Sequence, residues 1–242
     1  MDDLIYERLN SLEDRHWWFE GRRAVIWALL GHAQLPHPAR VLDVGCGTGR
    51  NLQEFAPLGE ITGIEPSASA VEFCHARGLK NAQQATVEHL PFEDETFDVA
   101  FAFDVLEHLD DDVAGLAEIK RVVKPDGWFV ATVPAYRWMW SSHDEAHHHR
   151  RRYTRLELVE RVVSAGWRPV FASYFNTILL PAIAAVRVFH RALAGQAGTD
   201  YDLTSGGLNR ALGAPMRLEA RLIARGIRLP AGVSIGIACR SV

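Results

Sequence analysis

The chain has 242 residues, 48% of them hydrophobic and 23% charged, which excludes a mostly disordered protein and is enough for one folded domain with a full core. The net charge of −4 hides an uneven split, because the first 120 residues hold 22 acidic and 9 basic side chains and the remainder hold 8 and 17. Cys46, Cys74 and Cys239 are too far apart to predict a disulfide framework or a metal-binding pair, and the chain starts acidic where a signal peptide is basic. These features predict a cytoplasmic protein.

The predicted elements begin with a helical segment, residues 1–35, which we expect to cover the sheet as a lid. Strands and helices then alternate through residues 36–175, and each strand is an apolar run that stops at a glycine, a proline or a polar turn. The strands are expected at 40–44, 61–64, 83–87, 97–103, 128–133 and 170–175. Residues 176–230 predict a helical insertion around a Gly-rich link at 195–207, and residues 231–242 hold the last strand.

Strands that alternate with helices indicate a mostly parallel sheet that is covered on both faces. We therefore predict an α/β, Rossmann-like fold in a single domain, 1–242. It combines a seven-stranded, mostly parallel sheet with the N-terminal helical lid and a helical insertion before the last strand. The longest apolar stretch, Thr177 to Val186, has about ten residues, against the ~20 that a membrane-spanning helix needs.

A glycine-rich turn follows the first strand, with Gly45, Gly47 and Gly49 at alternate positions. Glycine lets a ligand approach the backbone because no Cβ stands in the way, and the amides at the next helix start favour a polar or anionic group. The dinucleotide-binding spacing is not met, because residue 50 is an arginine. Glu65 ends the second strand about 20 residues after the first glycine, where a carboxylate can accept hydrogen bonds from both ribose hydroxyls. The pattern predicts a nucleoside-binding site.

These motifs together resemble the class I S-adenosylmethionine-dependent methyltransferases, in the type 11 subgroup that methylates small molecules. The matching stretches are VLDVGCGTG at 41–49, IEPS at 64–67, LPFEDETFD at 90–98, VLEHL at 105–109 and VVKPDG at 122–127. Their order along residues 40–134 is what makes the resemblance specific, because each motif alone is weak. The resemblance implies S-adenosyl-L-methionine as the cofactor.

The resemblance also implies which residues hold that cofactor. The glycine turn would cradle its methionine and ribose part, with Asp43 supporting the turn, and Glu65 would hold the ribose. Many relatives carry an aspartate at position 86 that holds the adenine amino group, whereas this chain has Thr86, so its hydroxyl or the neighbouring backbone would serve. Arg22 would pair with the cofactor carboxylate. The full expected set is Arg22, Asp43, Gly45, Cys46, Gly47, Gly49, Glu65, Pro66, Thr86, Val87, Glu88, Phe103 and Asp104.

The end of the fourth strand is a candidate site for catalysis, because this kind of fold binds its ligands outside the carboxyl ends of parallel strands. Asp104 or His108 can accept a proton there from a substrate hydroxyl, amine or thiol. His108 equally suits a structural hydrogen bond to a neighbouring backbone group.

A second candidate segment follows the fifth strand. Asp144, His149 and the run Arg151-Arg152-Tyr153 match a spacing that related small-molecule methyltransferases carry. His149 or Tyr153 would then act as a base or an orienting group, while the alternative is an Arg/Asp network that only holds the loop. Substrate contacts are expected from Trp18, Trp140, Asp144 and Arg152, although Trp18 can also be read as core packing.

Several side chains in this loop invite a metal-binding interpretation, namely His143, Asp144, His147, His148 and His149. Consecutive histidines on one loop rarely all face one ion, and metal ligands usually come from elements fixed by surrounding hydrogen bonds. We therefore expect no metal site.

The insertion is the part least like the family. Arginines recur on one helix face between residues 210 and 228, which is typical of a membrane-surface helix and equally of a solvated one, so peripheral membrane contact through 176–230 stays an alternative. We expect methyl transfer to an oxygen, nitrogen or sulfur atom of a small, hydrophobic molecule. The alternatives are a protein or nucleic-acid methyltransferase, which the basic second half supports, and a protein that binds the cofactor without catalysis. A nucleic-acid partner is disfavoured, because no Asn-Pro-Pro-Tyr-like motif ends the fourth strand.

Overall fold

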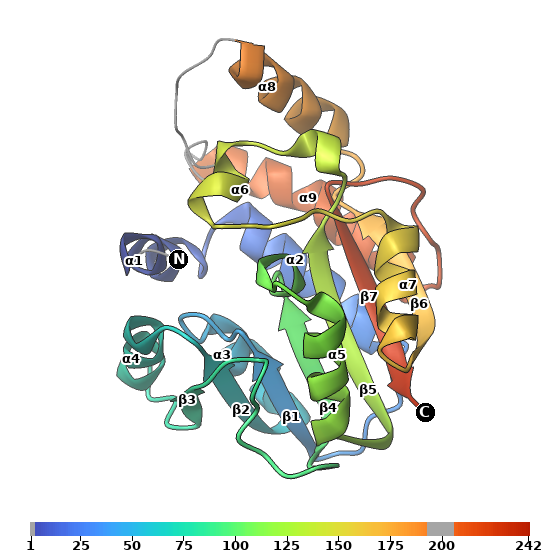
Figure 1. The fold of residues 1–242 in the computed structure, drawn as a ribbon. Coiled ribbons are helices and arrows are strands. Elements are labelled where there is room, and N and C mark those ends of the chain that lie inside the picture. The colour runs from blue at the N-terminus through green and yellow to red at the C-terminus, as the bar shows by residue number, and fades with distance from the viewer. Residues whose placement is uncertain (1–2, 193–205) are drawn as a thin grey trace.

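A seven-stranded sheet in the order β3-β2-β1-β4-β5-β7-β6 forms the centre of the protein (Figure 1). The computed structural model describes residues 3–192 and 206–242. The strands are β1 (Ala39–Val44), β2 (Gly59–Glu65), β3 (Ala82–Gln84), β4 (Phe97–Phe103), β5 (Val123–Pro134), β6 (Trp167–Phe175) and β7 (Ser234–Ser241). Strands β3, β2, β1, β4 and β5 are parallel, while β7 runs antiparallel between β5 and β6. The predicted seven-stranded, mostly parallel sheet is confirmed.

Helices cover both faces of the sheet, because side chains on successive residues of a strand point to opposite faces and both sets are apolar. In β4, Phe101 and Phe103 belong to one core and Ala100 and Ala102 to the other. The first core is closed by α2 (Trp17–Leu30), α3 (Arg50–Phe55), α4 (Ala68–Ala76) and α9 (Gly206–Ala224). The second is closed by α5 (Asp112–Val122) and α7 (Arg155–Ser164).

The remaining helices lie at or beyond the carboxyl ends of the parallel strands. They are α1 (Asp3–Leu12), α6 (Ser142–Ala146) and α8 (Leu180–Ala192), with the short 3₁₀ turns η2 (Leu106–His108) and η3 (Arg137–Met139), whereas the 3₁₀ turn η1 (Ala56–Leu58) directly precedes β2. The expected N-terminal and inserted helices are therefore present, as α1 and α2 and as α8 and α9. Most of the expected Gly-rich link at 195–207 lies outside the described residues.

Several strand ends differ from the sequence prediction, including the start of β6, which lies at Trp167 and not at residue 170. Strand β5 begins at Val123, whose pairing with Phe97 extends the strand back through the expected Pro125-Asp126-Gly127 turn. Strand β3 is only three residues long and lies at the sheet edge, where pairing on one side alone limits its length.

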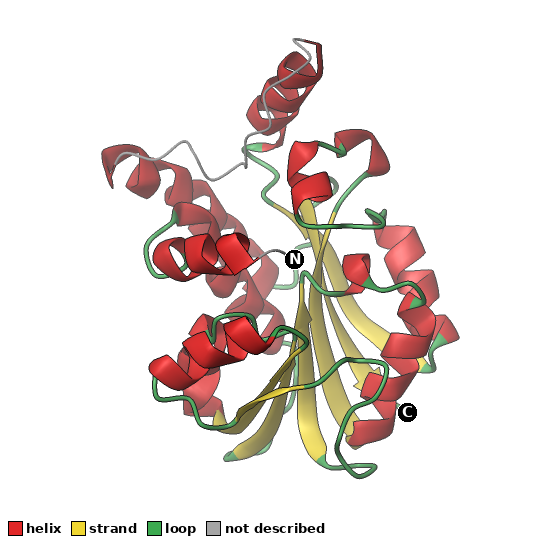
Figure 2. Cartoon of the chain, turned by 60° about the vertical axis from the view of Figure 1, so that its left-hand side comes forward, coloured by secondary structure: helices red, strands yellow, loops and turns green. Residues whose placement is uncertain are grey.

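Helix α9 packs beside α2 against the sheet, as Figure 2 shows from the side. Its buried face carries Met216, Ala220 and Ile223, at helical spacing. The helices approach closely because residue 21 is a glycine, where an added Cβ would lie only 2.6 Å from the Met216 sulfur. Leu218, on another face of α9, is exposed. The arginine-rich second half of the insertion is thus an integral layer of the domain.

Helix α8, by contrast, projects away from the sheet at the top of Figure 1. Val186 within it and Ile178 just before it are exposed to solvent. Of the helices in the described part of the chain, none is long and apolar enough to cross a membrane.

Replacing Gly21 by valine should lower the free energy of unfolding by about 1–3 kcal/mol, because the new side chain overpacks the fully buried Met216. Urea denaturation measures the change. Adding Met216→Ala opens space at the same point, so the double variant should lose less than the two single variants together. Strictly additive losses would show that the close approach of α2 and α9 is not the cause.

Candidate active site

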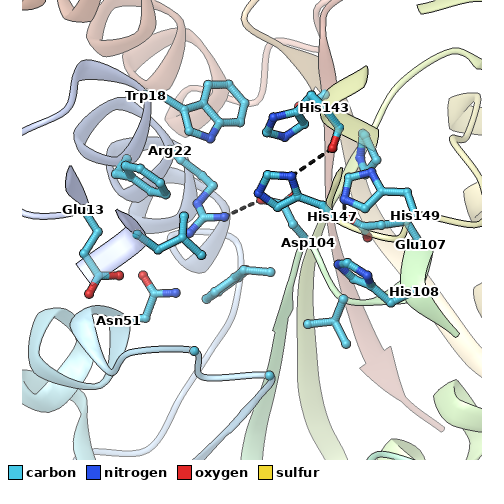
Figure 3. A pocket seen from close by; sticks show the side chains of 18 of the residues that line it. Glu13, Trp18, Arg22, Asn51, Asp104, Glu107, His108, His143, His147 and His149 are labelled. Carbon is cyan, nitrogen blue, oxygen red and sulfur yellow. Dashed lines mark hydrogen bonds and ion pairs between the residues drawn. The ribbon is translucent and has the colours of Figure 1, made fainter. Parts of the chain in front are cut away.

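One large cavity opens at the carboxyl ends of β1, β2 and β4, with a volume of about 630 Å³. This size is within the range of small-molecule sites. Figure 3 shows its middle part, where side chains from α2 face side chains that follow β4 and α6. The expected cofactor residues that line it are Arg22, Gly45, Cys46, Gly47, Glu65, Pro66, Thr86, Val87, Glu88, Phe103 and Asp104. The expected acceptor-site residues that line it are Trp18, Asp104, His108, His149 and Arg152.

The glycine turn forms one end of this cavity. Gly45, Gly47 and Gly49 all have positive φ, in the left-handed region that other residues rarely adopt. A Cβ on Gly47 would meet nothing within 4 Å, and because this residue lines the cavity, that space is open to a ligand. Gly49 lies behind the turn and outside the cavity lining, where a Cβ would collide with Leu79.

Glu65 ties the glycine turn to the end of β2. Its carboxylate accepts hydrogen bonds from the Gly47 amide at 3.0 Å and from the Ser67 amide at 3.2 Å. The hydroxyl of Tyr6, on α1, donates to the same carboxylate at 2.8 Å. Burial raises the pKa of Glu65, and these hydrogen bonds oppose that rise. The carboxylate is therefore held in place at the cavity wall by three separate segments.

Asp43 lies behind the turn and does not line the cavity. The carboxylate is 1% exposed and neither oxygen has a hydrogen-bond partner in the described part of the chain. Burial raises the pKa of Asp43 to about 8. The expected support of the turn by Asp43 is thus not made by a hydrogen bond in this structure.

The N-terminal helices close the cavity from the side opposite β4. Arg22 forms an ion pair with Asp104, which has positive φ directly after β4 and also accepts a hydrogen bond from Thr132. Figure 3 shows the Arg22–Asp104 pair crossing the middle of the cavity. Glu13 at the end of α1 accepts a hydrogen bond from Thr48, which fastens this helix to the glycine turn.

A wall of titratable side chains forms the other end, built from η2 and the loop after α6. It consists of Glu107, His108 and His149, and we refer to these three residues as the Glu–His wall (Figure 3). Burial, reinforced by the nearby histidines, lowers the pKa of His108 to about 4, so the imidazole is neutral at pH 7. Burial and the neighbouring Asp104 raise the pKa of Glu107 well above its ordinary value.

His149 is oriented by Asp144 rather than by the cavity. Nδ1 of His149 lies 2.9 Å from Asp144 Oδ1, and Arg152 donates to both oxygens of the same carboxylate at 2.7 and 2.9 Å. Asp144 also accepts the Ser141 amide as part of a capping box at the start of α6. Burial acts to raise the pKa of Asp144, but the hydrogen bonds from His149 and Arg152 outweigh it and hold this pKa well below the usual range. The hydrogen bond to Asp144 assigns a proton to Nδ1, while Nε2 lies 3.9 Å from Oε1 of Glu107.

Three residues expected at the acceptor end do not line the cavity, namely Asp144, Trp140 and Tyr153. Tyr153 is buried below it, where its hydroxyl donates to Asp112 at 2.8 Å and lies 3.1 Å from the Leu106 carbonyl. Burial and Asp112 raise the pKa of Tyr153 far above its ordinary value, so this phenol is a structural hydrogen-bond donor and not a base. Asp144 contributes to the site indirectly, because its hydrogen bonds hold the side chains of His149 and Arg152 in place.

Asn176 is a cavity residue that the sequence analysis missed. This side chain follows β6 directly, is 1% exposed, and neither its amide nitrogen nor its oxygen has a partner in the described residues. Its φ of +58° is in the left-handed region, which asparagine tolerates better than most residues. Buried Glu219 of α9 fixes the following turn by accepting the amides of Thr177 and Ile178, each at 2.9 Å to Oε1. An asparagine at a strand end was the available sequence signal, whereas nothing in the sequence pointed to Glu219.

Apolar side chains from the inserted helices complete this end of the cavity. They are Leu179, Ala182, Ile183, Val186 and Leu212. Trp18 faces them from α2 and stacks on Phe175 with 6.0 Å between ring centroids. The cavity therefore combines a polar, glycine-lined end with an apolar end that carries imidazoles and the amide of Asn176.

Comparisons with known proteins agree with this geometry. Residues 42–131 match the family described as "Methyltransferase domain". An uncharacterized methyltransferase of Bacillus subtilis is 31% identical over 141 residues, which are 55% of each chain. A ubiquinone biosynthesis O-methyltransferase of Haemophilus ducreyi is 35% identical over 106 residues, which are 39% of this chain and 45% of the relative.

Among solved structures, the chain resembles one of a complex between the Haloferax volcanii Trm112 methyltransferase activator and a methyltransferase. The TM-score is 0.65 at 19% identity, over 99% of this chain and 95% of that chain. At this identity the likeness supports the fold alone. The matched stretches span between 34% and 62% of the length of the curated relatives.

Replacing Asp144 by alanine should lower the free energy of unfolding by about 3–5 kcal/mol, because Arg152 would be left buried without its partner. Chemical denaturation at neutral pH measures the loss. Glu145→Ala is the matched control, since Glu145 is the next residue of α6 and is exposed. Equal, small effects of the two substitutions would contradict a structural role for the buried ion pair.

Proposed function

Because the chain carries a class I S-adenosylmethionine-dependent methyltransferase domain of the type 11 kind, we propose that it transfers the methyl group of this cofactor to an oxygen, nitrogen or sulfur atom of a small, partly hydrophobic molecule. The observation that carries the proposal is the shape of the single large cavity described above. The glycine turn and Glu65 lie at one end of it, and the Glu–His wall and apolar side chains lie at the other. A methyl donor and an acceptor can therefore occupy one enclosed space.

The residues at the first end fit the cofactor. Gly47 leaves open space where any other residue would place a Cβ, and the carboxylate of Glu65 is held at the wall, where it can accept ribose hydroxyls. We assign the adenine to the segment Thr86, Val87 and Glu88, and the methionine carboxylate to Arg22, which would exchange part of its pairing with Asp104. When bound, S-adenosylmethionine supplies an electrophilic sulfonium methyl group.

The second end fits an acceptor with an apolar body and at least one polar group. Trp18, Ile183 and Val186 offer apolar contacts, and the unpaired amide of Asn176 offers both a donor and an acceptor for a hydrogen bond. A buried amide without a partner costs free energy in the free protein, and a ligand that satisfies it recovers that cost. We therefore assign Asn176 to recognition of the acceptor.

Methyl transfer depends mainly on holding the nucleophile in line with the methyl group and the sulfur. The acceptor atom forms a bond to the methyl carbon while the carbon–sulfur bond breaks, and the electron pair stays on sulfur in S-adenosylhomocysteine. A hydroxyl acceptor must also lose its proton. We assign this activation to the Glu–His wall, where the imidazole of His108 is neutral at pH 7.

An oxygen acceptor is favoured by two observations. The matched relatives include an O-methyltransferase of ubiquinone biosynthesis, and the imidazoles of the wall suit a poorly nucleophilic hydroxyl that needs deprotonation.

The exposed apolar side chains of Ile178 and Val186, next to the cavity, are compatible with a hydrophobic acceptor that arrives from a membrane surface. Screening phenols and other small hydroxyl compounds with methyl-labelled cofactor tests the function. Cofactor binding without turnover in that screen, and in a parallel screen of amines and thiols, would instead support a non-catalytic binding protein.

Gly47→Val should weaken binding of S-adenosylhomocysteine at least about tenfold, because the new side chain enters the cofactor end of the cavity. Isothermal titration calorimetry measures the affinity, and NAD should not bind to the unaltered protein. Gly78→Val is the matched control. Gly78 also has positive φ and open space around its Cβ position, but it lies outside the cavity, so this variant carries the same backbone strain without blocking a ligand. Equal losses of affinity in both variants would remove Gly47 from the site.

Asn176→Gly should raise the KM for the acceptor found in the screen, by roughly five- to tenfold for one lost hydrogen bond. Glycine tolerates the φ of +58°, so the backbone is preserved. The affinity for S-adenosylhomocysteine is the internal control and should not change. If the cofactor affinity falls instead while KM is unaffected, Asn176 does not recognise the acceptor.

A further inference from the structure

We propose that the Glu–His wall is a binding site for one divalent transition-metal ion, ligated by Glu107, His108 and His149. One candidate ligand atom from each of the three side chains lies within 4.8 Å of the other two. The group lies at the acceptor end of the cavity and lines it. The sequence invited a metal-binding interpretation only for the side chains of the loop, at residues 143, 144 and 147–149, and no metal site was expected there. Of the loop histidines, His149 alone belongs to this group.

The strongest argument is the state of Glu107. It is fully buried, and both carboxylate oxygens are without a hydrogen-bond partner among the described residues. The two carboxylates nearest to it are compensated, since Asp104 pairs with Arg22 and Asp144 with Arg152. Burying an ionised carboxylate without a partner is costly, so a buried carboxylate normally coordinates a metal, pairs with a cation or takes up a proton. A bound cation satisfies both oxygens and supplies the missing positive charge.

The positions of the ligand atoms fit a shared ion better than a direct contact. Oε1 of Glu107 lies 3.9 Å from Nε2 of His149, which is too long for a hydrogen bond. Ligand atoms about 2.1 Å from an ion in tetrahedral geometry lie about 3.4 Å apart. The rings of His108 and His149 are nearly perpendicular, at 85°, with centroids 4.8 Å apart, so the two imidazoles approach the same point from different directions. Side-chain movements of about an ångström bring the three atoms, which lie within 4.8 Å of one another, to that spacing.

Supporting hydrogen bonds hold the two segments in this arrangement. The carboxylate of Asp144 accepts from Nδ1 of His149, which directs Nε2 toward the wall. This carboxylate–histidine pairing is the usual orienting contact behind a metal-bound imidazole. The Arg150 amide donates to the Glu107 carbonyl at 2.8 Å, and its guanidinium donates to the His108 carbonyl at 2.9 Å. The loop after α6 is therefore fastened to η2 by its backbone.

The donor set indicates the kind of ion. Two imidazole nitrogens and one carboxylate suit Zn²⁺, Fe²⁺ or Co²⁺, whereas Mg²⁺ and Ca²⁺ prefer oxygen ligands alone. Three protein ligands leave at least one coordination position open to the cavity, as in catalytic rather than structural sites. If the proposed function holds, an acceptor hydroxyl fills that position, and the ion lowers its pKa so that its proton passes to water before the oxygen attacks the methyl group. The binding of the ion itself does not depend on that function.

The test uses the full, untagged chain, stripped with EDTA and then freed of it. Titration calorimetry should show one Zn²⁺ per chain, no comparable binding of Mg²⁺, and visible absorption typical of a protein-bound ion when Co²⁺ is added. Glu107→Gln and His149→Asn should each weaken Zn²⁺ binding by at least about 100-fold, since loss of a mere supporting residue costs about 10–100-fold. His148→Asn is the control, because His148 is the preceding residue and is exposed. Asparagine suits its φ of +56°, and this variant should bind Zn²⁺ as the unaltered chain does.

The proposal is overturned if Zn²⁺ does not bind stoichiometrically, or if Glu107→Gln and His149→Asn leave its affinity unchanged. It is also overturned if His148→Asn is as damaging as they are, because the ion would then sit on the loop histidines. His108→Gln replaces Glu107→Gln if the latter does not fold, as judged by circular dichroism. S-adenosylhomocysteine is titrated into the same metal-free samples. Cofactor binding without Zn²⁺ binding rejects the metal site alone, whereas Zn²⁺ binding without cofactor binding rejects the proposed function alone.

Discussion

The cost of burying carboxylates governs how this protein is built around its cavity. The carboxyl ends of the parallel strands lie together at one end of the sheet, and several acidic side chains lie there, largely shielded from solvent. Each needs a partner in a place with little water. Asp104 forms an ion pair with Arg22, and Asp144 forms one with Arg152. Glu65 accepts hydrogen bonds from backbone amides and from the Tyr6 hydroxyl. The elements that supply these partners are thereby fixed over the cavity.

This constraint explains why the N-terminal helices and the insertion belong to the domain. Tyr6 and Arg22 come from α1 and α2, so the helices before the sheet are attached to it by polar contacts at its carboxyl edge. Glu219, on α9, does the same at the end of β6 by accepting two backbone amides. Apolar packing of α9 on α2 through Met216 and Gly21 then joins the two ends of the chain. The N-terminal helices and the insertion therefore both form walls of the same cavity.

The fold, and the place of the glycine turn and Glu65 at one end of the cavity, could be predicted from the sequence because their signals are local. Buried parallel strands are continuous apolar runs, and the turn needs glycine at fixed positions because its φ values are positive. The acceptor end was predicted less well. Tyr153 matched a motif but is turned toward Asp112, while Asn176 lies at the cavity without any motif. Which way such a side chain points depends on tertiary neighbours that are far away in the sequence, and no local pattern records them.

Glu107 is the clearest example of a side chain whose neighbours in the fold cannot be predicted from the nearby sequence. The sequence around Glu107 offers backbone amides but no arginine, so an arginine partner must come from elsewhere in the chain. In the folded chain such partners are taken, since Arg22 and Arg152 are bound to other carboxylates. The acid is left facing His149, which is 42 positions away in sequence and whose free nitrogen is aimed by Asp144. Among the described residues this buried acid has no hydrogen-bond partner, and it lies beside two imidazoles, so positive charge is missing at the point where we propose that the acceptor is activated. The net charges of the two halves of the chain therefore do not determine which ligand this cavity binds. The local pairing of each individual carboxylate determines it.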